Sequence, residues 1–172
     1  MTMKKIILGC LLTAVSSMAI ELGKVPPSVE LSGASGGKVD GTAWSSSMLK
    51  GKVHILFYVD PDERDLNKAL TQALKKRHFD RKKYASVAVI NLAATWLPNV
   101  ILESKLKAKQ KEFPDTIYVK DKKKVVLKKW DLADDNSDIL IFDKSGKLIY
   151  KKFGKLSDKE IKSVLALIEK NL

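Results

Sequence analysis

Apolar residues recur along the chain with two alternating periods, which predict the order of its strands and helices. The continuous apolar run Val53–Val59, bounded by Gly51 and Pro61, is typical of a strand that is buried on both faces. Asp60 is a favourable N-cap, Pro61 suits the first helical position, and an apolar stripe with helical spacing extends from Leu66 to Leu74. We therefore expect a helix that begins at Pro61, directly after the strand.

The remainder of the chain continues this alternation. Residues 20–43 contain Pro26 and Pro27 and are expected to form an extended lead-in, because proline resists helix formation. Further on, we expect a strand over 84–92, a helix over 99–112, two short strands over 116–119 and 125–130, a hairpin over 139–142 and 147–152, and a closing helix that begins at the capping box Ser157–Glu160. This order predicts an α/β domain with a mixed central sheet.

The first residues of the chain have the features of an export signal. Lys4 and Lys5 precede an apolar run over residues 6–15, and small residues at Ser17 and Ala19 suit signal peptidase. A membrane anchor is the alternative, but the run is shorter than the roughly 20 apolar residues that cross a bilayer. We therefore expect residues 1–19 to be a cleaved signal peptide, residues 20–172 to form a single domain, and the mature protein to be periplasmic without spanning the membrane.

The single cysteine of the chain lies inside this predicted signal. Cys10 follows Leu8 and Gly9, which gives a faint likeness to a lipoprotein acylation site, but too few apolar residues separate it from the lysines. We expect it to leave with the signal peptide. The mature chain would then have no cysteine, which excludes disulfide bonds, a thiolate nucleophile and a cysteine-rich metal site.

The net charge of the chain limits the kinds of partner that it is expected to bind. The chain carries 32 Lys and Arg against 20 Asp and Glu, a formal net charge of +12, and the loss of Lys4 and Lys5 leaves +10. Basic residues are concentrated over 75–83, and lysines over 105–129, without the interleaved aromatics of a nucleic-acid stacking surface. Outside the cytoplasm we expect no nucleic-acid partner, and anionic lipid, anionic glycan or an acidic protein are the alternatives. The alternative is that these basic runs are solvent-exposed faces without a binding role.

The order of elements resembles the thioredoxin-like fold. The segment Leu49–Phe57 is similar to the first central strand of exported thioredoxin-like and peroxiredoxin-like proteins. In those proteins redox cysteines follow this strand, whereas residues 60–65 here are Asp-Pro-Asp-Glu-Arg-Asp. The proline that faces the active site in that family would fall near Asn136–Asp138, where this chain has none. The resemblance implies a three-layer sandwich with a mixed central sheet, and the two missing hallmarks argue against thiol activity.

A more specific resemblance covers most of the mature chain, from Gly51 to the C-terminus. The segments Trp130–Leu132, Asp134–Ser137 and Asp143–Lys147, together with Leu102–Ser104, are similar to the YtfJ-type family of small periplasmic proteins. This resemblance implies a thioredoxin-like fold and a periplasmic address. It supplies no catalytic or cofactor-binding residue, because that family has no established function.

Two acidic segments are the candidate functional residues. One is the cluster over 60–65, and the other includes Asp131, Asp134, Asp135 and Asp138. In a thioredoxin-like fold both would lie at the carboxyl end of the central strands, where open α/β sheets place their ligands. The possible binding surface comprises Asp60, Asp62, Glu63, Asp134 and Asp135. Helix capping and a solvated turn are the structural alternatives.

The sequence contains no clear pattern of catalytic or metal-binding residues. His54 and His78 lie in different predicted elements without a nucleophile nearby, and the acidic spacing is not that of a calcium loop. We therefore assign no catalytic residue, metal or cofactor, and expect no enzyme activity. The hypothesis is a non-catalytic binding or accessory module with an unknown periplasmic partner. The alternatives are an enzyme that uses carboxylates or a metal in the vacant cleft, and a peripheral envelope component bound to anionic lipid or glycan.

Overall fold

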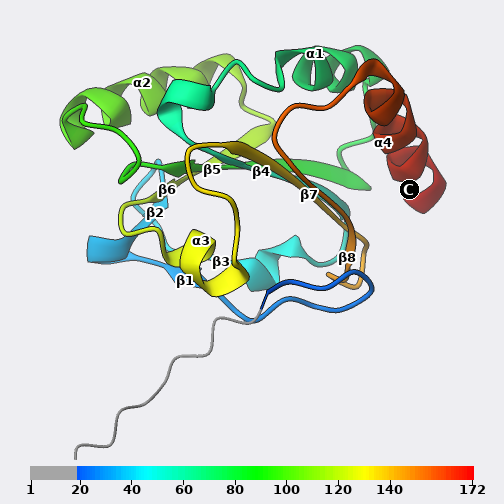
Figure 1. The fold of residues 1–172 in the computed structure, drawn as a ribbon, viewed down its shortest axis with the longest axis horizontal. Helices are drawn as coiled ribbons and strands as arrows, with labels where there is room; N and C mark the ends of the chain where they lie inside the picture. The colour runs from blue at the N-terminus through cyan, green and yellow to red at the C-terminus, as the bar shows by residue number, and fades with distance from the viewer. Residues whose placement is uncertain (1–18) are drawn as a thin grey trace, which may run out of the picture.

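A computed structural model describes residues 19–172, so the predicted signal peptide lies almost entirely outside the described residues (Figure 1). The elements are β1 (Glu30–Leu31), β2 (Gly36–Lys38), β3 (Trp44–Ser45), β4 (Val53–Val59), α1 (Lys68–Arg77), β5 (Tyr84–Asn91), α2 (Asn99–Glu112), β6 (Thr116–Asp121), α3 (Val125–Trp130), β7 (Ser137–Phe142), β8 (Leu148–Phe153) and α4 (Asp158–Asn171). Within this range no helix has both the length and the apolar content that a membrane span requires.

The main sheet is mixed, as predicted. Its strand order is β2-β6-β5-β4-β7-β8, in which β4, β5 and β6 are parallel to one another, and β7 is antiparallel to β4. Every residue of β4 is buried, in agreement with its continuous apolar run. The parallel strands end at one common edge of the sheet, which we call the carboxyl edge, and they begin at the opposite edge, the amino edge.

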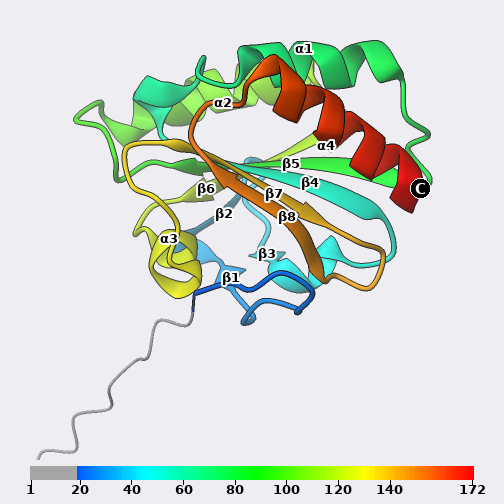
Figure 2. The ribbon, with the colours of Figure 1, turned by 45° about the vertical axis from the view of Figure 1, so that its right-hand side comes forward.

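Helices and loops cover both faces of this sheet (Figures 1 and 2). The helices α1, α2 and α4 pack on one face, where Leu70 and Ile168 meet Ile55 and Ile141. The other face is covered by α3 and by the N-terminal segment with β1 and β3, which bury Trp44 and Trp130 against the sheet. The domain is therefore the three-layer α/β sandwich that the sequence predicted.

The prediction of a strand over 125–130 is wrong, because these residues form the helix α3. The carboxylate of Asp121 at the end of β6 accepts the backbone N–H groups of Val125 and Val126, both at 2.9 Å. This cap satisfies donors of the first helical turn. It outweighs the preference of two adjacent valines for strands.

The helix predicted from Pro61 begins later, at Lys68. Residues Pro61–Glu63 form one 3-10 turn, and the Asp60 side chain makes no capping hydrogen bond. The buried amide of Asn67 instead donates to Gly154 O at 3.1 Å and accepts from Leu156 N at 3.0 Å. These bonds to the β8–α4 connection hold the chain out of a continuous helix.

The N-terminal lead-in is more ordered than predicted. Gly23 N donates to Leu148 O at 2.7 Å and Leu148 N donates to Lys24 O at 2.9 Å, so this segment lies along the start of the edge strand β8. Ile20 is buried in the core, whereas Ala19 is exposed. At the opposite side of the sheet, β2 needs glycine at position 36, where φ is 135° and an added Cβ would lie 1.8 Å from the Lys120 carbonyl oxygen.

Candidate functional site

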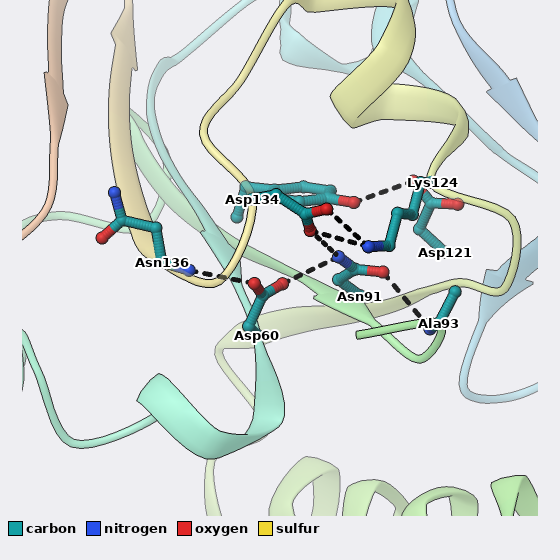
Figure 3. A network of polar contacts seen from close by, with 8 residues as sticks. Asp60, Asn91, Ala93, Asp121, Lys124, Asp134 and Asn136 are labelled. Carbon is teal, nitrogen blue, oxygen red and sulfur yellow. Dashed lines mark hydrogen bonds and ion pairs between the residues drawn. The ribbon is translucent and has the colours of Figure 1, made fainter. Parts of the chain in front are cut away.

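Polar side chains gather where the parallel strands end. Asp60 follows β4, Asn91 is the last residue of β5, and Asp121 is the last residue of β6. The loop over 131–136, which connects α3 to β7, closes over the same carboxyl edge (Figure 3). Four segments that are distant in sequence therefore meet at one place.

Asp60 forms the centre of this network. Asn91 Nδ2 donates to Asp60 Oδ1 at 2.8 Å, and Asn136 N donates to Asp60 Oδ2 at 2.9 Å (Figure 3). Asp60 is 2% exposed, and this burial raises the pKa of its carboxyl against the opposing effect of its hydrogen bonds. Asp60 thus connects the end of β5 to the loop before β7.

Asp134 forms an ion pair with the side-chain ammonium group of Lys124. Lys124 Nζ lies 2.8 Å and 2.6 Å from the two carboxylate oxygens of Asp134. This contact lowers the pKa of Asp134 and raises that of Lys124. Asn91 Nδ2 makes a longer contact of 3.4 Å with Asp134 Oδ1, which connects the pair to Asp60.

Three carboxylates of the site lie close enough to act together. Asp60, Asp134 and Asp135 each offer an oxygen, and these oxygens all lie within 4.8 Å of one another. Hard cations take oxygen ligands at such spacing, and an ammonium or guanidinium group also suits it. Since Lys124 already contacts Asp134, the observed chemistry is that of ammonium binding.

Asp138 is a further carboxylate beneath this group. It pairs with Tyr58 across β7 and β4, so its side chain leaves the sheet on the same face as the aromatic ring. Ala133 N donates to its Oδ2 at 2.9 Å, whereas its buried Oδ1 has no hydrogen-bond partner within the described part of the chain. Burial raises the pKa of Asp138 to about 7, and the charge of Asp60 acts in the same direction.

The floor of the site is a second buried contact. Tyr58 Oη donates to Asp121 Oδ2 at 3.3 Å, and neither side chain is accessible to solvent. Burial raises the pKa of Tyr58 far above its usual value, and the negative charge of Asp121 adds to this effect. The hydroxyl therefore stays protonated and acts as a donor.

Only three of the five predicted binding residues lie close together in the structure. Asp60, Asp134 and Asp135 come together, but Asp60 is buried and supports the surface rather than lining it. Asp62 is exposed and Glu63 half-buried on the 3-10 turn, and neither belongs to the three-carboxylate group.

Sequence reasoning missed Tyr58, Asn91, Asp121 and Lys124 as parts of the site. A polar residue at the end of each apolar strand was the available signal for Asn91 and Asp121. Lys124 directly precedes α3 and has a left-handed backbone, with φ of 54°, which sequence spacing did not indicate.

The positions of the redox hallmarks contain no sulfur. Asp60 and Pro61 directly follow β4, and residues 19–172 include no cysteine. No peptide bond within the described range is cis, including those at Asn136–Asp138. His54 is buried and bonded through Nδ1 to Lys52 O at 3.0 Å, and His78 is exposed after α1.

Solved structures share this fold at low sequence identity. A thiol peroxidase from Chromobacterium violaceum matches with a TM-score of 0.64 and 10% identity, over 90% of this chain and 89% of that chain. The exposed lipoprotein thioredoxin Etrx1 from Streptococcus pneumoniae matches with a TM-score of 0.60 and 16% identity, over 84% and 99% of the respective chains. These likenesses establish the thioredoxin-like fold.

Two sequence relatives are bacterial proteins. An uncharacterised protein, YtfJ, from Escherichia coli is 26% identical over 184 residues and covers all of both chains. An uncharacterised protein from Haemophilus influenzae is 28% identical over 128 residues, which cover 73% of this chain and 70% of that protein. The family model YtfJ_HI0045 matches residues 24–171, which include the whole sheet and the acidic site. The chain therefore belongs to the YtfJ_HI0045 family of bacterial proteins of unknown function.

Proposed function

We propose that this protein is an exported, non-catalytic binding module that takes a cationic group of a partner protein at its carboxyl edge. The observation that carries the proposal is the contact between Lys124 and Asp134. The site binds one ammonium group at 2.6 Å, while Asp135 is exposed beside it. A lysine or arginine of a partner would find the same chemistry at Asp135, and could exchange with Lys124 at Asp134.

The lack of a cysteine in residues 19–172 supports a role other than redox exchange. A thioredoxin-like scaffold without a cysteine after β4 has no nucleophile for disulfide exchange at that place. Asn91 and Asn136 also hold the buried carboxylate of Asp60 in place, and Asn91 reaches Asp134 at 3.4 Å, so the surface is partly preformed.

Two features support export. Lys4, Lys5 and the apolar run after them have the composition of a signal peptide. The first residue that packs into the core within the described range is Ile20, so cleavage after Ala19 would leave all three core clusters intact.

The test is affinity capture from an envelope extract with tagged processed protein, followed by mass spectrometry. We expect the double variant Asp134→Asn/Asp135→Asn to lose the captured partners. The matched control is Glu112→Gln/Asp115→Asn, which removes the same charge from exposed residues near the amino edge. Capture should also weaken as salt rises, because exposed ion pairs are screened.

Retention of every partner by Asp134→Asn/Asp135→Asn would refute this site. An insulin-reduction assay on the processed protein tests the non-redox part separately. We expect no thiol-dependent turnover, and turnover by protein free of contaminating enzymes would overturn that part of the proposal.

A further inference from the structure

A second charged surface lies at the amino edge of the sheet. The helices α1 and α2 both end there, and the loop before β5 lies between them in sequence. Eight exposed basic residues form what we call the basic edge: Lys75, Lys76, Arg77, Arg81, Lys82, Lys83, Lys109 and Lys111. The acidic residues within the same segments are Asp80, Glu112 and Asp115.

The ring of Phe113 brings the two helix ends together. Lys75 Nζ of α1 lies 5.6 Å from the centre of this ring, and Lys109 Nζ of α2 lies 5.0 Å from it. Basic residues that are more than 30 positions apart in sequence therefore share one surface. The fold therefore concentrates these basic residues on one surface, beyond what the lysine content of the chain alone would give.

Both arginines of the basic edge form ion pairs, whereas most of its lysines form none within the described residues. Arg77 pairs with Glu169 at 2.7 Å, and Arg81 pairs with Asp115 at 3.4 Å. Lys109 pairs with Glu112 at 2.8 Å. The basic-edge residues that have no ion-pair partner within the described part of the chain are all lysines: Lys75, Lys76, Lys82, Lys83 and Lys111.

The basic edge is separated from the acidic site by the length of the sheet. The seven residues of β4 span about 20 Å, which exceeds two Debye lengths at physiological salt. The two surfaces therefore act on their surroundings almost independently, and a partner at one edge leaves the other free.

We infer that the basic edge is a docking surface for an anionic phospholipid bilayer. Flexible lysines carry point charges without a fixed geometry, which suits a diffuse anionic surface better than a single phosphate pocket. The Phe113 ring is covered by lysine side chains and is not free to stack on a base, which disfavours nucleic acid. In the docked orientation the carboxyl edge, with Asp134 and Asp135, points away from the bilayer and stays accessible.

The experiment is vesicle co-sedimentation with the processed chain that begins at Ile20. The test vesicles contain equal parts of phosphatidylglycerol and phosphatidylcholine, and the reference vesicles contain phosphatidylcholine alone. We expect binding to the anionic vesicles only, and at least a tenfold loss of the partition coefficient for Lys76→Glu/Lys111→Glu, since each basic residue near an anionic surface adds to attraction. The milder pair Lys76→Gln/Lys111→Gln should show a smaller loss in the same direction.

The matched control is Lys128→Glu/Lys129→Glu. These lysines are also exposed in the last turn of a helix, but α3 lies on the opposite face of the sheet. The same change in net charge should here alter binding less than twofold. Circular dichroism and thermal unfolding of each variant confirm that it is folded.

Equal losses in both charge-reversed variants would overturn the proposal, because they would indicate an effect of net charge without a docking surface. Absence of binding to the anionic vesicles, or equal binding to phosphatidylcholine, would also overturn it. The variant Asp134→Asn/Asp135→Asn should bind vesicles at least as well as the wild type. This result separates failure of the lipid surface from failure of the acidic site.

Discussion

Asn91 Nδ2 and Asp60 Oδ1 are 2.8 Å apart, and this hydrogen bond joins the carboxyl ends of two neighbouring parallel strands inside the protein. The contact connects the acidic surface to the sheet, since Asp60 also accepts the backbone N–H of Asn136. The residue directly after β4, where the resemblance to thioredoxin-like proteins implied the start of a redox motif, is thus a structural carboxylate.

Asp60→Ala should destabilise the fold by about 2–4 kcal/mol, because it leaves the buried amide of Asn91 and the partly buried backbone N–H of Asn136 without this acceptor. Urea unfolding followed by circular dichroism measures this change. Asp62→Ala is the control, since Asp62 is exposed on the adjacent turn, and we expect its effect to stay within about 0.5 kcal/mol. Equal stability of Asp60→Ala and wild type would contradict the structural role.

Asp121→Ala should unfold or fray α3 and cost about 3 kcal/mol, because two N–H groups of the helix and the Tyr58 hydroxyl lose their acceptor. Faster amide hydrogen exchange over residues 125–130 is the expected local sign. Asp131→Asn, at the other end of α3, changes an exposed carboxyl and should leave that exchange unchanged. Unchanged protection in Asp121→Ala would show that packing alone holds the helix.

Asp138 gives a prediction for pH. Its carboxyl holds a proton up to about pH 7 in the folded protein and releases it near 3.8 when unfolded. Folding therefore takes up a proton between these values, so the contribution of Asp138 to the free energy of unfolding falls as pH rises from about 4 to about 7, and levels off above that. Asp138→Asn stays neutral and escapes this loss.

The difference in stability between Asp138→Asn and wild type should therefore grow by about 2–4 kcal/mol between pH 4 and pH 8, in favour of the variant. Urea unfolding at a series of pH values measures it. A difference that does not vary with pH would mean that the buried carboxyl has an ordinary pKa.

Protein recovered from a periplasmic extract should begin at Ile20, because Ser17 and Ala19 provide the small residues of a cleavage site. N-terminal sequencing and intact mass give the result directly. Ala19→Asp should block processing and retain the protein in membranes. An acylated N-terminal cysteine at position 10 would refute this processing and indicate a lipoprotein.

Much of the fold could be predicted from the sequence where local signals and burial agreed. The apolar run of β4, the turn glycine at Gly146 and the capping box at Ser157 all occur as expected, with φ of 83° at that glycine. The strand predicted over 125–130 was wrong because its helical cap comes from Asp121, which acts through a tertiary contact as well as a local one.

The acidic site could be predicted only in outline. Placement of Asp134 and Asp135 near the end of β4 followed from the expected fold, and the structure brings their oxygens close to Asp60. The contribution of Lys124 was not predictable, because this residue directly precedes α3, a helix where the sequence had predicted a strand. The burial of Asp60 was also hidden, since four segments enclose it only after the sheet has formed.

The bonds between the N-terminal segment and Leu148 have a consequence for self-association. An exposed edge strand is a template for pairing with another chain, and β8 would be such a strand over its full length without Gly23 and Lys24. Gly23 and Lys24 make hydrogen bonds to the backbone of Leu148, the first residue of β8. Further along the strand, the charges of Lys151 and Lys152 disfavour pairing with a second copy of the chain. Removal of residues 20–24 should therefore turn this sheet edge into a site of intermolecular β-aggregation.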